Sequence, residues 1–434
     1  MHAETIFALS SGQGRAGVAV IRVSGPAVEL VGHRLLGRTP EPRKAHLAAI
    51  RDPADGSVID RGLVLFFPQP ASFTGEDVLE LQVHGSIAVV RRLLAVLSAL
   101  EGCRPADAGE FSRRAFLNGK LDLLEVEALS HLLDAEVEMQ RSLAVEGSFW
   151  LRNQSEQWRS AILEMRALVE AQIDFSDEGD VQDRLDSATE QVILKFADEI
   201  DSTLERLRVG ERIRLGYRIA VLGPPNAGKS SLVNALADRD ISIVSAIPGT
   251  TRDALETTLD LDGLPVVLVD TAGIRDSGAD PIEQEGIRRS FLAAQRADLV
   301  IWASPVDSVL ECPDKQYLVV RTKSDLLPEG AVDELAVSAH TGSGLANLVS
   351  RLKWRALEGD HTAGMRALLG NERQASALRH ASAALRVAAC HASTSLDLRA
   401  EELRVATSAL DALVGRIHQE EVLGAIFSRF CVGK

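Results

Sequence analysis

The chain has 434 residues, of which 46% are hydrophobic and 25% are charged, and its formal net charge is −15. That length allows two to four domains, and the apolar content is sufficient for packed cores. No apolar run approaches the roughly 20 residues of a membrane span. The first residues lack the basic flank and apolar stretch of a secretion signal. The acidic balance argues against a general nucleic-acid coat, so any contact with RNA would need a local basic patch.

The four cysteines are scattered along the chain and form no C-x-x-C pair. They are Cys103, Cys312, Cys390 and Cys431. This spacing disfavours both a zinc site and a disulfide framework, and it is typical of a reducing compartment. We therefore expect a cytoplasmic protein with no membrane association.

Residues 1 to about 117 have the pattern of a small domain that mixes strands and helices. Strand-like apolar runs occupy 17–23, 62–67 and 77–83. The last of these alternates with a period of two, which places Glu76, Glu80 and Gln82 away from the apolar face. An apolar helix is predicted over 86–100.

The rest of the chain contains a strand-and-helix region between two helical regions. Residues 122 to about 209 are rich in Leu, Ala, Glu and Arg, and the chain becomes helical again after residue 361. The acidic run 174–180 is interpreted as a solvated loop in preference to a metal site. Residues 216 to about 357 alternate between strand and helix, as parallel nucleotide-binding sheets do. The predicted strands are 217–222, 264–269, 298–303 and 316–321.

This order favours one helical domain with a nucleotide-binding domain inserted into it. The expected boundaries are 1–118 for the N-terminal domain, 119–214 and 359–434 for the two helical parts, and 215–358 for the insertion.

Residues 223–230 have the sequence GPPNAGKS, which is the phosphate-loop pattern G-x-x-x-x-G-K-[ST]. Gly223 and Gly228 let the backbone curl so that its N–H groups face one centre, where the following helix adds a positive partial charge. Lys229 can reach the outer phosphates, and the Ser230 hydroxyl can bind Mg²⁺. A chance glycine-rich turn is the alternative, and it is disfavoured because further nucleotide motifs follow in order.

Two of these motifs concern the phosphates. Asp270-Thr-Ala-Gly ends an apolar strand, where an Asp can hold the water shell of Mg²⁺. The Gly273 N–H can sense the γ-phosphate. Thr251 lies in Pro248-Gly-Thr-Thr-Arg-Asp and is the natural second hydroxyl ligand of Mg²⁺.

The other two motifs concern the base. Asp325, in Thr322-Lys-Ser-Asp, can accept two donors from the guanine edge that adenine does not offer. Ser338-Ala-His340 would close over the base. The nucleotide-binding set expected from these motifs is Asn226, Ala227, Gly228, Lys229, Ser230, Ser231, Ser245, Ala246, Ile247, Pro248, Gly249, Thr250, Thr251, Asp270, Thr271, Ala272, Gly273, Thr322, Lys323, Asp325, Ser338, Ala339 and His340.

Two positions modify the prediction of GTP binding. The guanine motif usually begins with Asn and here begins with Thr322, whose hydroxyl can still donate a hydrogen bond. Asn226, inside the phosphate loop, could bind a monovalent cation that supplies the charge of an arginine finger. The alternative for Asn226 is a hydrogen bond that only stabilises the loop.

Taken together with stretches outside the nucleotide domain, the sequence resembles the MnmE/TrmE family of tRNA-modifying GTPases. Those stretches are GVAVIRVSG at 17–25, SFTGEDVLEL at 72–81, GEFSRRAFLN at 109–118, KLDL at 120–123 and FSRFCVGK at 427–434. The resemblance implies an N-terminal α+β folate-binding domain, a helical domain, and a Ras-like P-loop GTPase domain inserted into the helical one.

The resemblance also implies a chemistry and partners. The family forms a homodimer through its N-terminal domains, uses a tetrahydrofolate derivative as one-carbon donor, and works with the flavoprotein MnmG. Together they add a carboxymethylaminomethyl or aminomethyl group to carbon 5 of the wobble uridine of certain tRNAs. GTP is hydrolysed with Mg²⁺ and with K⁺ in place of an arginine finger.

By position, the resemblance assigns site residues to this chain. The expected Mg²⁺ ligands are Ser230 and Thr251, and the expected K⁺ ligands are Asn226, Ser245, Ile247 and Thr250. The water-positioning glutamate is Glu283, with Glu285 as the alternative. The folate positions are Arg22, Glu80, Lys120 and Lys434.

Some of these residues have simpler interpretations. Taken alone, Arg22 and Lys120 would be ordinary surface cations. Cys431 is either a small apolar residue or a second catalytic residue, a nucleophile or an acid/base in the uridine chemistry. A ribosome-assembly GTPase or a regulatory GTPase without modification chemistry is the competing function. The first should carry a basic RNA-binding module, which is not visible, and the second leaves the folate stretches and the terminal Cys-Val-Gly-Lys without a role.

Overall fold

The computed structural model describes most of the chain in two compact units. The described residues are 4–174, 182–238, 243–245, 255–261, 263–270, 294–307, 312, 314, 316–327, 335–357, 367–390, 395–417, 420–428, 430, 432 and 433. The first unit comprises Met1–Ser130 with Asp411–Lys434, and the second comprises His131–Leu410. None of the described helices combines the length and apolar character that crossing a bilayer requires.

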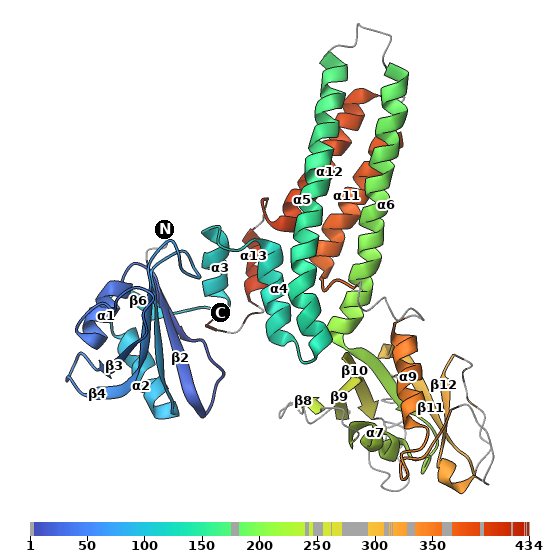
Figure 1. Ribbon diagram of the computed structural model, residues 1–434, viewed down its shortest axis with the longest axis horizontal. Helices are drawn as coiled ribbons and strands as arrows, with labels where there is room; N and C mark the ends of the chain where they lie inside the picture. The colour runs from blue at the N-terminus through green and yellow to red at the C-terminus, as the bar shows by residue number, and fades with distance from the viewer. Residues whose placement is uncertain are drawn as a thin grey trace. The chain divides into compact units, whose positions relative to one another are not determined.

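The first unit contains a six-stranded sheet with the order β3-β4-β5-β2-β1-β6 (Figure 1). Its strands are β1 (Thr5–Leu9), β2 (Ala16–Ser24), β3 (His46–Arg51), β4 (Val58–Phe67), β5 (Val78–Gly85) and β6 (Cys103–Pro105). All neighbouring strands are antiparallel except β1 and β6. The three predicted strand runs are confirmed as β2, β4 and β5, whereas β1, β3 and β6 were not predicted.

One face of this sheet packs on helices α1 (Val28–Leu36) and α2 (Ile87–Ser98). The predicted helix over 86–100 is therefore confirmed as α2. The period-two pattern explains the core, because Leu79, Leu81 and Val83 of β5 are buried while Glu80 and Gln82 between them are half-buried on the other face. A third helix, α3 (Glu110–Leu117), follows β6.

Long helices dominate the second unit, as predicted. They are α5 (Glu138–Asp174), α6 (Gln182–Leu215), α11 (Glu372–Cys390) and α12 (Leu396–Val414), whereas α4 (Leu123–Asp134) begins in the first unit and ends in the second. Figure 1 shows α11 and α12 alongside α5 and α6. Two of the long helices therefore precede the nucleotide-binding sheet and two follow it, which confirms the insertion. The acidic run after α5 lies, from residue 175 on, outside the described residues.

The inserted sheet has seven strands in the order β13-β12-β11-β7-β10-β9-β8. They are β7 (Tyr217–Leu222), β8 (Ile243–Ser245), β9 (Leu255–Leu261), β10 (Leu264–Asp270), β11 (Leu299–Pro305), β12 (Leu318–Thr322) and β13 (Ala336–Val337). The four predicted strands are confirmed as β7, β10, β11 and β12, with small shifts at their ends. β8, β9 and β13 were not predicted.

The central strand β7 runs parallel to β10 and β11, and β12 runs parallel to β11. Their apolar residues, among them Ile219, Leu268, Ile301 and Val320, are buried in one core. Helices α7 (Lys229–Asp238) and α9 (Leu345–Ala356) belong to the same part of the chain. Because these strands are parallel, their carboxyl ends meet at one edge of the sheet, where ligands of such sheets bind.

Where the chain enters this sheet, a side chain from α5 holds the end of α6. The Gln140 amide donates to the carbonyls of Ile213 and Arg214, at 3.1 and 3.2 Å. These carbonyls belong to the last turn of α6 and have no partner within the helix. The buried amide therefore fixes the point at which the chain enters β7.

Candidate functional site

The phosphate loop leaves β7 through glycine-dependent geometry. Gly223 and Gly228 have φ angles of 151° and 82°, and Asn226 has 61°. A Cβ atom at Gly223 would lie 2.4 Å from the Ala303 carbonyl oxygen, so only glycine lets the loop pass β11 here. The loop then enters α7 at Lys229, which confirms the predicted strand, loop and helix.

Lys229 is held at the loop by its own ammonium group. Its Nζ donates to the carbonyls of Gly223 and Pro224, at 3.0 and 2.9 Å. The Ser230 and Ser231 side chains are exposed in the first turn of α7, where helix N–H groups lack carbonyl partners. A cation, hydroxyls and unpaired N–H groups at one helix end are the donors that a polyphosphate requires.

Thr322 ties the base-binding segment to the phosphate loop. Its buried Oγ1 donates a 2.6 Å hydrogen bond to the Ala227 carbonyl, across 95 residues of chain. A hydroxyl has a single proton to donate. The Thr322 hydroxyl proton, which the sequence suggested as a donor to the base, is therefore donated to the phosphate loop.

Asp325 is exposed next to Ser338 of the following motif. Its Oδ1 accepts a 2.6 Å hydrogen bond from the Ser338 hydroxyl, which itself accepts the Thr341 N–H at 3.2 Å. The Ser338 hydrogen bond lowers the pKa of Asp325. The structure thus brings together two separate base motifs and leaves an ionised carboxylate open to a ligand.

Several predicted site residues lie outside the described residues. They are Ala246, Ile247, Pro248, Gly249, Thr250, Thr251, Thr271, Ala272, Gly273, Glu283, Glu285, Cys431 and Lys434. Ser245 and Asp270 end β8 and β10, and the backbone of Asp270 is in register with Val221 of β7. The strand that ends in Asp270 therefore runs beside the strand that leads into the phosphate loop.

A second candidate site lies on the sheet of the first unit. Arg22 of β2 and Glu80 of β5 face each other in register and form an ion pair of 2.9 Å. The Arg22 guanidinium carbon lies 5.1 Å from the centre of the Phe73 ring and 5.8 Å from that of Phe111. Arg22 is only 21% exposed, and it is therefore not the ordinary surface cation that it could be taken for in isolation.

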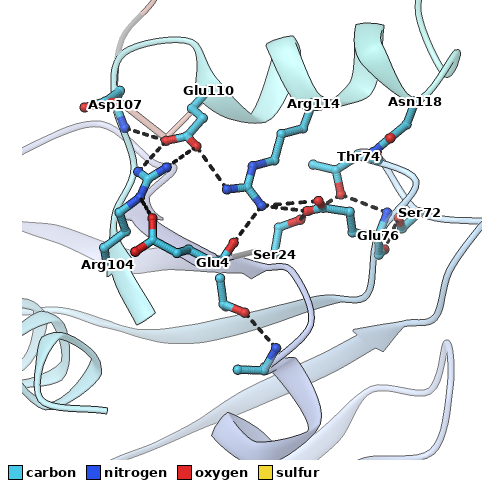
Figure 2. A network of polar contacts seen from close by, with 12 residues as sticks. Glu4, Ser24, Ser72, Thr74, Glu76, Arg104, Asp107, Glu110, Arg114 and Asn118 are labelled. Carbon is cyan, nitrogen blue, oxygen red and sulfur yellow. Dashed lines mark hydrogen bonds and ion pairs between the residues drawn. The ribbon is translucent and has the colours of Figure 1, made fainter. Parts of the chain in front are cut away.

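A buried polar network surrounds Arg114 in the same unit (Figure 2). The Arg114 guanidinium is 1% exposed and donates through Nη1 to the Glu76 carboxylate and through Nη2 to Glu110, each at 3.0 Å. Arg104 also donates to Glu110. Burial alone would raise the pKa of Glu110, but hydrogen bonds from Arg104, the Asp107 N–H and Arg114 outweigh it and lower the pKa to about 2.

Further hydrogen bonds join the loop at 72–77 to the end of β2 and to the residue that follows α3. The Ser24 hydroxyl donates to Glu76 at 2.8 Å and is bonded to the Thr74 hydroxyl at 2.7 Å, and the Asn118 amide donates to the Thr74 carbonyl at 2.7 Å. The stretches at 17–25, 72–81 and 109–118 therefore meet in space. Lys120 is exposed, and its aliphatic chain runs along Gly75 of the same loop.

The end of the chain packs on this unit. The Ser10 hydroxyl donates to the Gly433 carbonyl at 2.9 Å, and Ala108 forms a β-bridge with Val432. Gly433 has a φ of 102° and approaches so closely that a Cβ atom would lie 2.2 Å from the Leu9 carbonyl oxygen. Ala8, the residue before Leu9, pairs with Arg22 in the sheet. The described tail residues are thus fixed near the strand that carries Arg22.

Comparisons with known proteins decide the family. A model of the "GTP-binding protein TrmE N-terminus" matches residues 5–120, and a model of the "MnmE helical domain" matches residues 123–431. The chain is 49% identical over 440 residues to the tRNA modification GTPase MnmE of Methylobacterium sp. (strain 4-46), covering 99% of this chain and 100% of that protein. It is 47% identical to the protein of the same name from Azorhizobium caulinodans, covering 99% of each.

The chain belongs to the MnmE family of tRNA modification GTPases. The family resemblance and the enzyme class predicted from the sequence are therefore confirmed. Among solved structures, the chain is similar to the G domain of the T. maritima FeoB iron transporter, with 24% identity and a TM-score of 0.23, over 33% of this chain and 97% of that one.

In this MnmE-family chain, the sequence alone did not single out Arg104, Glu110 or Arg114 as part of a site. Glu110 and Arg114 are four residues apart on one helix, a spacing that allows an ion pair. The spacing gives no indication that both are buried or that Arg114 also binds Glu76. That contact joins residues 38 positions apart, and only the folded chain reveals it.

Proposed function

We propose that this protein hydrolyses GTP and, with the flavoprotein MnmG, modifies carbon 5 of the wobble uridine of certain tRNAs. The observation that carries the proposal is the meeting of the phosphate loop and the base-binding segment at one sheet edge, joined by the bond from Thr322 to Ala227. This edge belongs to a chain of the tRNA modification GTPase family. A cytoplasmic location follows from the tRNA substrate.

The proposal gives chemical roles to the main residues of the nucleotide site. Lys229 and the N–H groups at the start of α7 bind the β- and γ-phosphates. Ser230, with Thr251, would hold Mg²⁺, and Asp270 would bind its water shell. Asp325 accepts hydrogen bonds from the guanine edge, and Ser338 keeps that carboxylate in place.

Hydrolysis needs positive charge where negative charge develops on the phosphates. We assign this charge to K⁺, bound by Asn226, Ser245, Ile247 and Thr250. Asn226 is exposed in the phosphate loop, so its side-chain oxygen is accessible to a cation. Glu283 would orient the attacking water, with Glu285 as the alternative.

The N-terminal unit would bind a tetrahydrofolate derivative. Because Arg22 is paired with Glu80, the pair offers both donors and acceptors to a pterin edge. Lys120 is exposed and has no ion pair within the described part of the chain. With Lys434, it would supply the positive charge that glutamyl carboxylates require. The folate would supply a one-carbon unit, and the tail would hold Cys431 near it.

A homodimer through the N-terminal domains agrees with the exposed apolar side chains of this unit. Leu47 of β3 and Leu63 of β4 face each other in register and are 77% and 42% exposed. A second copy would cover them, in keeping with the apolar centre of dimer interfaces. We keep the domain boundaries at 1–118, 119–214, 215–358 and 359–434; the family models end and begin at residues 120 and 123, close to the first of these boundaries.

The proposal is tested on the purified protein with GTP and with 5-formyl-tetrahydrofolate. We expect GTP turnover that depends on Mg²⁺ and is stimulated by K⁺, and folate binding that does not require nucleotide. Turnover without any folate binding would leave the GTPase in place and favour the competing function, a regulatory GTPase without modification chemistry.

A further inference from the structure

The Arg114 guanidinium connects two segments of the first unit, and each segment carries one of the two phenylalanine rings that contact Arg22. Figure 2 shows Arg114 of α3 between Glu110, on its own helix, and Glu76, on the loop after β4. Arg114 also donates to the carbonyl of Glu4, the residue before β1, at 3.0 Å. A single buried side chain therefore fixes three parts of the domain.

The two carboxylates that Arg114 binds lie close in sequence to the two rings that contact Arg22. Phe111 directly follows Glu110, and Phe73 lies three residues before Glu76. Both rings lie within cation–π distance of the Arg22 guanidinium. A shift of either carboxylate would therefore move the backbone segment that carries the neighbouring ring.

The geometry requires arginine in particular. Nη1 and Nη2 are the two arms of one planar fork, and each reaches a different carboxylate. A lysine ammonium is a single point on a flexible stem and cannot hold both in fixed directions. Since the guanidinium is 1% exposed, water cannot replace the missing hydrogen bonds.

We propose that Arg114 is a positioning residue for the N-terminal site. By binding Glu76 and Glu110, it fixes the positions of the Phe73 and Phe111 rings. These rings in turn hold the Arg22–Glu80 pair in the position in which it binds the one-carbon donor. The inference rests on the proposed folate function for its ligand, but the placement of the rings can be measured without any ligand.

The central test is the variant Arg114→Lys in the full-length protein. All 12 phenylalanines are replaced by 4-fluorophenylalanine, and the fluorine signals of Phe73 and Phe111 are assigned by their loss in Phe73→Leu and Phe111→Leu. We expect both signals to shift or broaden in Arg114→Lys. Calorimetry with 5-formyl-tetrahydrofolate should show affinity weakened about tenfold or more. Losses of this size are typical when a residue that orients the direct ligands is replaced.

A matched control separates positioning from general loss of stability. Asp52 has a nearly buried carboxylate, 4% exposed, paired with Arg92 in the same unit. It follows β3, at the opposite edge of the sheet from β6. Asp52→Asn should also lower the unfolding temperature, yet leave both fluorine signals and the folate affinity unchanged. GTP turnover should be unchanged in both variants.

The outcomes distinguish the two proposals. A folded Arg114→Lys protein with unchanged fluorine signals and unchanged affinity overturns the positioning role. If Arg114→Lys does not fold, Glu76→Gln, which keeps the shape and removes the charge, decides the same question with the same readouts. A wild-type protein that binds no folate removes the one-carbon role, and the fluorine spectra then decide the positioning role by themselves.

Discussion

The Thr322 hydroxyl and the Ala227 carbonyl, 95 residues apart in the chain, form a 2.6 Å hydrogen bond in the interior of the nucleotide domain. Both residues are buried. The bond joins the end of β12, which leads to Asp325, to the phosphate loop. A change at one end of the nucleotide site can therefore affect the other end.

Replacing Thr322 with valine tests this connection. Thr322→Val keeps the shape but leaves the Ala227 carbonyl buried without its partner, which costs about 1–3 kcal/mol. We expect affinity for GTP and GDP to fall on the order of tenfold, with the preference for guanine retained. Thr322→Ser, which keeps the hydroxyl, is the control in fluorescent-nucleotide titrations. Equal affinity of Thr322→Val and wild type would show that the bond does not shape the site.

Base selectivity is assigned to Asp325. Loss of the hydrogen bonds from the guanine edge to the carboxylate should cost roughly 10²-fold in GTP affinity, and Asp325→Asn should shift the preference toward xanthine nucleotide. Competition titrations with GTP, ATP and XTP measure this. Wild-type protein that binds ATP as tightly as GTP would refute the assignment.

Acid should destabilise the N-terminal unit through Glu110. Its pKa in the folded protein is about 2, below the ordinary value of 4.5, because hydrogen bonds from Arg104, Asp107 and Arg114 outweigh burial. The stabilisation is therefore complete above about pH 4.5 and is lost as the pH falls toward 2. Amide hydrogen exchange of β1 and β2 peptides should reveal this loss. Glu110→Gln should flatten the acid dependence, and an unchanged profile in that variant would contradict the prediction.

Turnover should depend on K⁺ through Asn226. Asn226→Ala should still bind GTP but lose most K⁺ stimulation, and Glu283→Ala should bind GTP and lose turnover. Glu285→Ala is the matched control for the second variant. Phosphate release in KCl and NaCl measures both effects. Normal turnover by Glu283→Ala in K⁺ would transfer the role to Glu285.

The phosphate loop and its strand could be predicted because their signals are local. β7 is a short apolar run followed directly by spaced glycines, and its ends match the prediction. β9 was missed because its sequence, LETTLDL, mixes polar and apolar residues in an antiparallel strand. β6 and β13, with three and two residues, are too short to show a pattern, and β6 pairs with β1 from the start of the chain, which no local pattern indicates.

The polar contacts of both sites were harder to predict than the elements that carry them. The sequence indicated Arg22, Glu80, Thr322 and Asp325 as ligand contacts, but it did not indicate that Arg22 binds Glu80 or that Thr322 binds Ala227. Such pairs join residues 58 and 95 positions apart. They depend on strand register and loop conformation, both of which are set by the whole fold.

The most direct measurement of the central claim is the nucleoside profile of tRNA from cells that lack this protein. We expect loss of the carboxymethylaminomethyl or aminomethyl group at the wobble uridine. The wild-type gene should restore it, whereas Cys431→Ser, with intact GTP turnover and folate binding, should not. Full restoration by Cys431→Ser would make the thiol dispensable. An unchanged wobble uridine in cells lacking the protein would contradict the proposed function itself.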